Sequence, residues 1–183
     1  MNRLKIIIVL VSICLHGQAQ RVKTPHPQAS SFVRFTENNQ QWDKHIKYRA
    51  QLDGGALFVE QSGKLTFHLY DKDVYRSRHL GKIISSTLKY HAYSINFIGS
   101  NSLPQIESSH AYEDYDNYFI GSDQQRWAKQ VHHYKSISVK GLYQGIDALY
   151  NGGSQSIKYN FIVHPDGNPS DVKLQYRYRK HQA

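Results

Sequence analysis

Four carboxylates gather in one short stretch of the 183-residue chain and could bind a hard cation. They are Glu113, Asp114, Asp116 and Asp123, set among tyrosines. Ca²⁺ takes about six to eight oxygen ligands, and clustered carboxylates in a loop commonly supply them. The spacing does not match an EF-hand loop, which alternates its ligands around a glycine and ends in a glutamate. We keep the four as Ca²⁺ candidates beside a plainer interpretation, a polar strand edge or turn.

The same acidic group could serve glycoside hydrolysis, which uses a pair of carboxyl groups about 5–9.5 Å apart. That separation exists only in three dimensions, so the sequence leaves it open. The segment Asp166-Gly167-Asn168-Pro169-Ser170-Asp171 also offers oxygen atoms, but these residue types are the ones that tight turns require. We interpret it as a turn.

Eleven histidines raise the question of a transition-metal site. His132 and His133 are neighbours, and in a strand neighbouring side chains point to opposite faces, so the two cannot share one ion without a bulge. The other histidines have no recognisable ligand spacing. The G-x-S-x-G, P-loop and dinucleotide-binding patterns are absent as well. We therefore expect a protein that is not an enzyme and has no cofactor.

Aromatic residues could form a sugar-stacking platform. Two tryptophans, Trp42 and Trp127, accompany fourteen tyrosines. Flat aromatic rings on an exposed β-face would suit a carbohydrate-binding module. Most of the tyrosines, however, lie on the apolar side of an alternating pattern, where burial of a large side chain contributes roughly 1.5–3 kcal/mol. Core packing is the plainer interpretation of those rings.

The first residues predict export. Arg3 and Lys5 precede an apolar run from Ile6 to Leu15, and Ala19 ends a small-residue cleavage pattern. Residues 1–19 are therefore a predicted signal peptide, because a run of ten apolar residues is too short to span a bilayer. We expect no membrane span after its removal. Residues 20–31, with two prolines, are a predicted flexible leader.

Removal of Arg3 and Lys5 would lower the formal net charge by two, from +9 to +7. The remaining basic residues are spread along the chain, so we interpret them as a solvated face and expect no nucleic acid partner. The only cysteine, Cys14, lies in the signal peptide, and the mature chain would carry no disulfide.

The elements that must position these residues are strands. Apolar and polar residues alternate with period two in five segments, as in half-buried antiparallel strands. The segments are 46–52, 65–69, 93–97, 157–163 and 172–178. Turn signals such as Asp53-Gly54-Gly55 separate them, no helical stripe is visible, and 71–89 is a predicted long connection. We predict an all-β domain over 32–178, an antiparallel β-sandwich-like two-sheet domain of about ten strands, with a tail at 179–183.

Four ordered motifs resemble a known domain. The first is F-T-E-N-N-Q-Q-W with Glu37, Asn38 and Trp42, and the second is N-Y-F-I-G-S-D with Asn117, Tyr118 and Gly121, followed by Trp127. The third is L-Y-Q-G-I-D-A-L-Y with Tyr143, Gly145 and Asp147, and the fourth is K-Y-N-F-I-V-H-P with Tyr159 and Pro165. Together they are similar to the N-terminal domain of unknown function in SBBP-repeat (β-propeller) surface proteins of Bacteroidetes-type bacteria.

The resemblance implies a context and no catalytic residue. It implies a secreted, non-catalytic structural or interaction module at the N-terminus of a larger cell-surface or extracellular protein, one associated with type IX secretion. Its partners would be downstream repeat domains or a surface glycan, and the alternatives are a module that binds an anionic glycan and a glycoside hydrolase. Gln40 stands where the family pattern favours glycine, and Asp166-Gly167 shifts a proline-glycine turn. The chain ends directly after a predicted strand, which we interpret as a truncated frame or a stand-alone copy.

Overall fold

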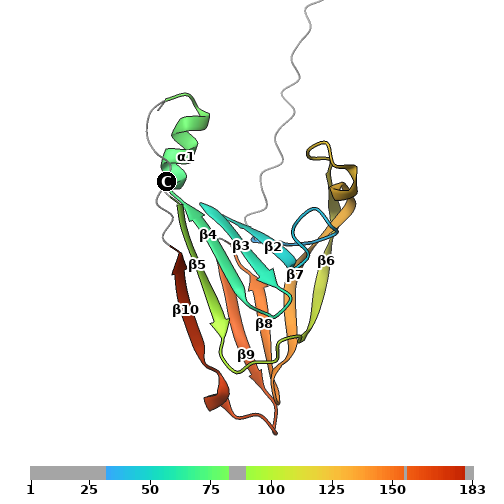
Figure 1. Cartoon of the computed structure of the whole chain (residues 1–183), viewed down its shortest axis with the longest axis vertical. Coiled ribbons are helices and arrows are strands. Elements are labelled where there is room, and N and C mark those ends of the chain that lie inside the picture. The colour runs from blue at the N-terminus through green and yellow to red at the C-terminus, as the bar shows by residue number, and fades with distance from the viewer. Residues whose placement is uncertain (1–31, 83–89, 155, 180–183) are drawn as a thin grey trace, which may run out of the picture.

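The fold is one curled, mostly antiparallel β-sheet (Figure 1). The structure is a computed structural model that describes residues 32–82, 90–154 and 156–179. Its ten strands are β1 (Phe35–Glu37), β2 (Ile46–Leu52), β3 (Gly55–Glu60), β4 (Leu65–Tyr70), β5 (Tyr90–Phe97), β6 (Gln105–Tyr118), β7 (Ala128–Tyr143), β8 (Ile146–Gly152), β9 (Ile157–Val163) and β10 (Leu174–Arg179). The prediction of an antiparallel all-β chain is confirmed.

Strand β7 joins the two halves of the sheet. The strands follow the order β10-β5-β4-β3-β2-β1-β7-β8-β9, and β6 pairs with the other side of β7. Near its middle, β7 pairs with β1 at His133 and Tyr134, and from Ser136 onward it pairs with β8. One long strand therefore leads from the half that contains β1–β5 and β10 into the half that contains β8 and β9.

The core lies between these two halves. Phe35, Leu57, Ile137 and Tyr150 are fully buried, each contributing on the order of 1.5–3 kcal/mol of hydrophobic stabilisation. The Tyr150 hydroxyl on β8 donates to the Gly63 carbonyl beyond β3, 3.3 Å away. All ten strands belong to one hydrogen-bonded sheet, so two separate sheets are not confirmed.

The predicted alternating segments form strands, and β5 has the expected faces. In β5, Ile95 and Phe97 are buried in the core while Ser94 and Asn96 lie on the opposite face. In β9 and β10, three residues of the predicted apolar faces are exposed instead, Tyr159, Tyr176 and Tyr178. β2 and β9 begin and end where the alternation does, and β4 extends one residue beyond it. Period two thus located these strands correctly.

The segment 71–89 connects β4 to β5, as predicted, but it contains helix α1 (Lys72–His79), which the sequence analysis did not predict. The Asp71 side chain caps it by accepting from the backbone N–H groups of Asp73 and Val74. None of its residues is buried, so the helix needs no apolar stripe. The helical period of apolar residues by which a sequence usually reveals a helix is therefore absent here. Residues 83–89 lie outside the described part of the chain.

The predicted signal peptide, the whole predicted leader and the last four residues also lie outside the described residues. Export therefore stays a prediction. Among the residues that the structure describes, no helix is long and apolar enough to cross a membrane.

Candidate interaction surface at the β6–β7 hairpin

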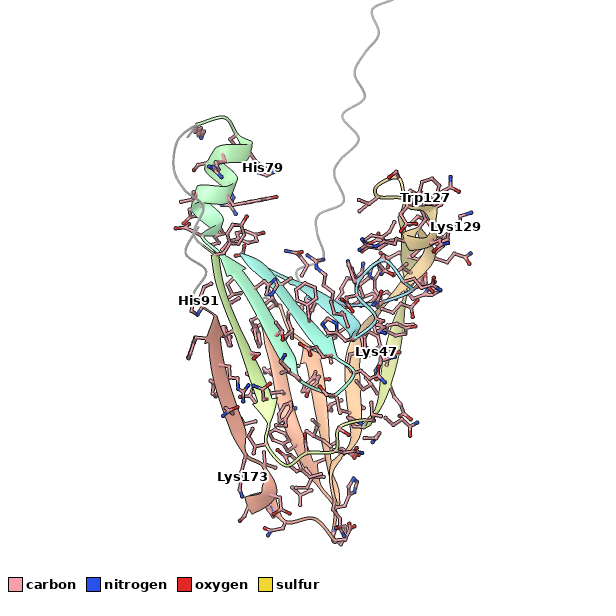
Figure 2. All side chains as sticks on the ribbon, viewed as in Figure 1. Lys47, His79, His91, Trp127, Lys129 and Lys173 are labelled. Carbon is pink, nitrogen blue, oxygen red and sulfur yellow. The ribbon has the colours of Figure 1, made fainter. Side chains whose placement is uncertain are left out.

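The hairpin between β6 and β7 carries large apolar side chains in solvent. Ile120 is 75% exposed, Phe119 52% and Trp127 38%. The Phe119 and Trp127 rings meet edge to face at 5.6 Å, and the Lys129 ammonium lies 6.0 Å from the Phe119 ring. Figure 2 shows Trp127 and Lys129 together where the hairpin projects from the rim of the sheet. We call these four residues the hairpin tip.

Local hydrogen bonds fix the shape of the tip. The Trp127 indole N–H donates to the Gly121 carbonyl at 3.1 Å, and Gly121 adopts a positive φ of 79°. Asp123 starts the short 3₁₀ turn Gln124–Arg126 by accepting from the Gln125 N–H at 3.0 Å. The exposed rings are therefore held in place by the turn itself.

Asn38 organises the loop that lies below the tip. Its amide nitrogen donates to the carbonyls of Asp43 at 2.9 Å and Ile46 at 2.8 Å, and its oxygen accepts from the Trp42 N–H at 3.1 Å. Trp42 then packs edge to face on Tyr118 of β6 at 5.7 Å. The first two sequence motifs thus meet at this rim.

Glu37 and Asn117 attach the strands of the same rim to one another. The Glu37 carboxylate accepts from the His132 N–H at 2.9 Å and from the Tyr134 hydroxyl at 3.1 Å. Burial and the nearby Glu37 raise the pKa of Tyr134, so it remains a donor. Asn117 accepts from the backbone N–H of Gln130, which has a positive φ of 52°. These side chains thus accept from backbone N–H groups for which the regular strand pairing provides no acceptor.

The third and fourth motifs lie at the other end of the sheet. Asp147 accepts from Lys140 Nζ and the Gly141 N–H, both at 2.8 Å, and from His164 Nε2 at 3.2 Å. Burial alone would raise the pKa of Asp147, but these three donors outweigh it and lower the pKa to about 2. Asp147 is therefore a structural anion that anchors the β7–β8 turn.

Gly145 makes a close backbone contact at this end. A Cβ there would lie 2.5 Å from the backbone nitrogen of Gly167, and φ of Gly145 is +63°. Nearby, the Tyr143 hydroxyl donates to the Ile98 and Lys173 carbonyls at 3.3 Å. Tyr159 contacts Phe161 edge to face on β9, and Pro165 is exposed in the loop that follows. The motif residues therefore form two separate groups.

Residues 35–182, which include both groups of motif residues, match the family model described as domain of unknown function (DUF7948). The chain belongs to the DUF7948 family. No curated protein and no solved structure matches it. The expected domain of unknown function is confirmed at that level, whereas the link to SBBP repeats and Bacteroidetes-type bacteria stays a prediction.

In the DUF7948 domain the four candidate carboxylates do not form one ligand set. Asp114 forms a bidentate ion pair with Arg34, with N–O distances of 2.6 and 2.7 Å. Asp123 caps the 3₁₀ turn at the hairpin tip. Glu113 is exposed on β6. Within residues 32–82, 90–154 and 156–179, no three His, Cys, Asp or Glu side chains are grouped so that they could hold a metal ion.

Asp116 instead faces a buried histidine. His133 Nε2 lies 3.5 Å from Asp116, and its Nδ1 lies 2.9 Å from Thr36 Oγ1. Burial lowers the pKa of His133, although Asp116 opposes the shift. His132 points to the other face and meets the Tyr115 ring, as expected for neighbours in a strand.

The sequence analysis did not single out Phe119, Ile120 or Lys129. The available signal was the pair of apolar residues placed directly before the turn residues Gly121-Ser122-Asp123. Turn tips are normally polar, so an apolar pair at that position indicates a contact surface.

Proposed function

We propose that the DUF7948 domain is a non-catalytic interaction module that binds a protein partner through the hairpin tip. One observation carries the proposal: Phe119, Ile120 and Trp127 stand exposed beside one another on a hydrogen-bonded turn. Clustered exposed apolar side chains are typical of binding sites on monomeric domains.

The geometry of the tip suits a protein partner. Tryptophan is enriched among the residues that dominate interface energies, particularly where neighbouring contacts exclude water. Because the turn is already ordered, a partner would lose little binding energy in fixing the rings. Lys129 beside the rings would favour an acidic surface on the partner.

The wider context follows the sequence analysis. We propose that the chain is exported by its signal peptide, acts at the cell surface or outside the cell, and precedes SBBP-type repeats in a longer polypeptide. We further propose that the facing halves of the curled sheet serve as the two layers of a sandwich, since core residues from both halves interlock.

The test is the assembly size of the protein in the cells that make it. Ile120→Asp replaces the most exposed apolar side chain of the tip with a charge, and we expect the protein to leave its complex and migrate as a monomer. Leu103→Asp is the matched control, because Leu103 is 67% exposed at the opposite end of β6. A complex that survives Ile120→Asp unchanged would exclude the tip as the binding surface.

A further inference from the structure

A polar groove of about 520 Å³ runs along the outer face of the sheet, opposite the core. Its floor is strand β5, where Ala92, Ser94 and Asn96 point outward. Residues of β4 and β10 line its sides; Thr66 and Arg177 are the register partners of Ser94. The groove exists because short side chains on the middle strand lie between longer ones, and its volume is typical of small-molecule sites, about 300–1,000 Å³.

The groove carries an unneutralised positive charge. Among the described residues that line it, the one carboxylate is Glu60, which already accepts from Thr66 Oγ1 at 2.6 Å and pairs with Lys64 at 3.0 Å. Arg177 bonds through Nε to the neutral Gln175 and forms no ion pair within the described residues. The guanidinium edge of Arg177 is thus available for a planar anion.

Polar side chains surround this charge. His45, His68 and Ser94 line the groove, each able to donate or accept. Asn96 adds an amide whose nitrogen is buried without an acceptor within the described residues. Buried amide groups are normally hydrogen-bonded, so a donor without an acceptor marks a place where a ligand oxygen would be stabilising.

We propose that this groove binds a carboxylate-bearing saccharide. The carboxylate would pair with Arg177, and the sugar hydroxyls would exchange hydrogen bonds with His68, Ser94 and Asn96. A peptide fits less well, because β5 is already paired on both sides by β4 and β10 and so has no free edge to which a peptide strand could add. The proposal does not depend on the hairpin tip, which lies at the β6–β7 end of the sheet.

Titration calorimetry with trigalacturonate, galactotriose and triglutamate tests the proposal on the purified chain. We expect trigalacturonate to bind more tightly than either of the other two by about tenfold or more, since a charge-assisted bond contributes on that order. Binding should weaken as salt rises. Equal affinity for galactotriose or triglutamate, or no binding of trigalacturonate, would overturn the proposal.

Two variants locate the site. Arg177→Gln removes the charge from an exposed side chain and should weaken trigalacturonate binding about tenfold, whereas Ser94→Leu should fill the floor and abolish it. Lys173→Gln makes the same charge change just before β10 and should leave the affinity within about twofold. Backbone amide shifts in the wild-type chain provide a readout that needs no variant. Shifts centred on Thr66 and Ser94 support the groove, and shifts confined to 119–129 exclude it.

Discussion

Gln40 has a backbone conformation that favours glycine, the residue that the resemblance in the sequence analysis implies for this position. Its φ is +78°, a left-handed conformation that costs an L-residue about 1–2 kcal/mol, and its side chain is exposed. Glycine adopts this φ freely but loses about 0.5–1 kcal/mol through the entropy of the unfolded chain. Position 40 therefore has a backbone conformation that favours glycine, although the residue there is glutamine.

Gln40→Gly should therefore raise the free energy of unfolding by about 0.5–1 kcal/mol, measured by urea denaturation. Lys44→Gly, in the same loop but without a positive φ, should lower it. A destabilised Gln40→Gly variant would show that this loop conformation is not occupied in solution.

His133 should make stability depend on pH below neutrality. Its pKa is lowered by burial, so the unfolded chain binds a proton at about pH 6.5 while the folded chain does not. Stability is then full above pH 6.5 and falls as the pH drops from 6.5 toward the lower folded value. The charges of Asp116, Arg34 and Asp114 act on the ring, as does His132 from the other face of the strand, and together they set how far that value lies below 6.5.

Urea unfolding between pH 8 and pH 5 measures this loss of stability. His133→Gln keeps a polar group beside Thr36 and Asp116 but cannot titrate, so its stability should be flat across the range. An equally steep pH dependence in that variant would assign the effect to another group.

Asp147 should act at lower pH. Because its folded pKa is about 2 against an ordinary 3.8, it stabilises the fold by about 2 kcal/mol above pH 3.8, and that stability is lost as the pH falls from 3.8 toward 2. Asp147→Asn should remove it at neutral pH, as seen in thermal unfolding. Asp166 is an exposed residue in the loop after β9, so Asp166→Asn should change the melting temperature little.

At the scale of elements, the turn after β7 depends on a contact between two backbones. Gly141 and Gly145 have nearly the same φ, +60° and +63°, but a Cβ at 141 meets nothing within 4 Å while one at 145 meets Gly167. The two positions therefore separate the cost of a positive φ from the cost of a steric clash.

Gly141→Ala should lower the free energy of unfolding by about 1 kcal/mol, and Gly145→Ala by about 3 kcal/mol or more. Denaturant titration of both variants compares them directly. Equal losses would mean that the Gly145–Gly167 contact is absent in solution.

Sequence reasoning located some elements and missed others for identifiable reasons. Strands β2, β4 and β5 each bury residues on one face, and the alternation records it. In β9 and β10 the alternation located the strands, but three residues on the predicted apolar face are exposed, Tyr159, Tyr176 and Tyr178. In β6 and β7 that period is interrupted, because His110 and Gln130 adopt positive φ and the register shifts between Ala111 and Tyr115. The helix α1 buries nothing, so hydrophobic patterning carries no trace of it.

At the scale of the whole molecule, alternation predicts which face is buried but not which strands are neighbours. The same alternating pattern would also fit two separate sheets. Because β1 and β8 both pair with one side of β7, the strands form a single curled sheet instead. The clustering of the first two motifs at the tip rim follows from the same long-range pairing. Residues 37–42 and 117–127 meet only because β1 pairs with β7, which is far from it in the sequence, and no local pattern encodes that pairing.

The curled sheet thus presents two separate outer features, a polar groove lined by residues of β4, β5 and β10 and an apolar tip on the β6–β7 hairpin. Separate sites would allow the domain to hold a saccharide and a protein at the same time. Each of the two proposed sites can be tested separately, because no residue belongs to both.

The most direct measurement is site-specific photocrosslinking from the hairpin tip in the cells that produce the protein. A photoreactive phenylalanine analogue at position 120 should give one discrete adduct with a protein, and the same probe at Leu103 should give none. Adducts of equal yield from both positions, or none from position 120, would contradict the account of the DUF7948 domain as a module that binds through its tip.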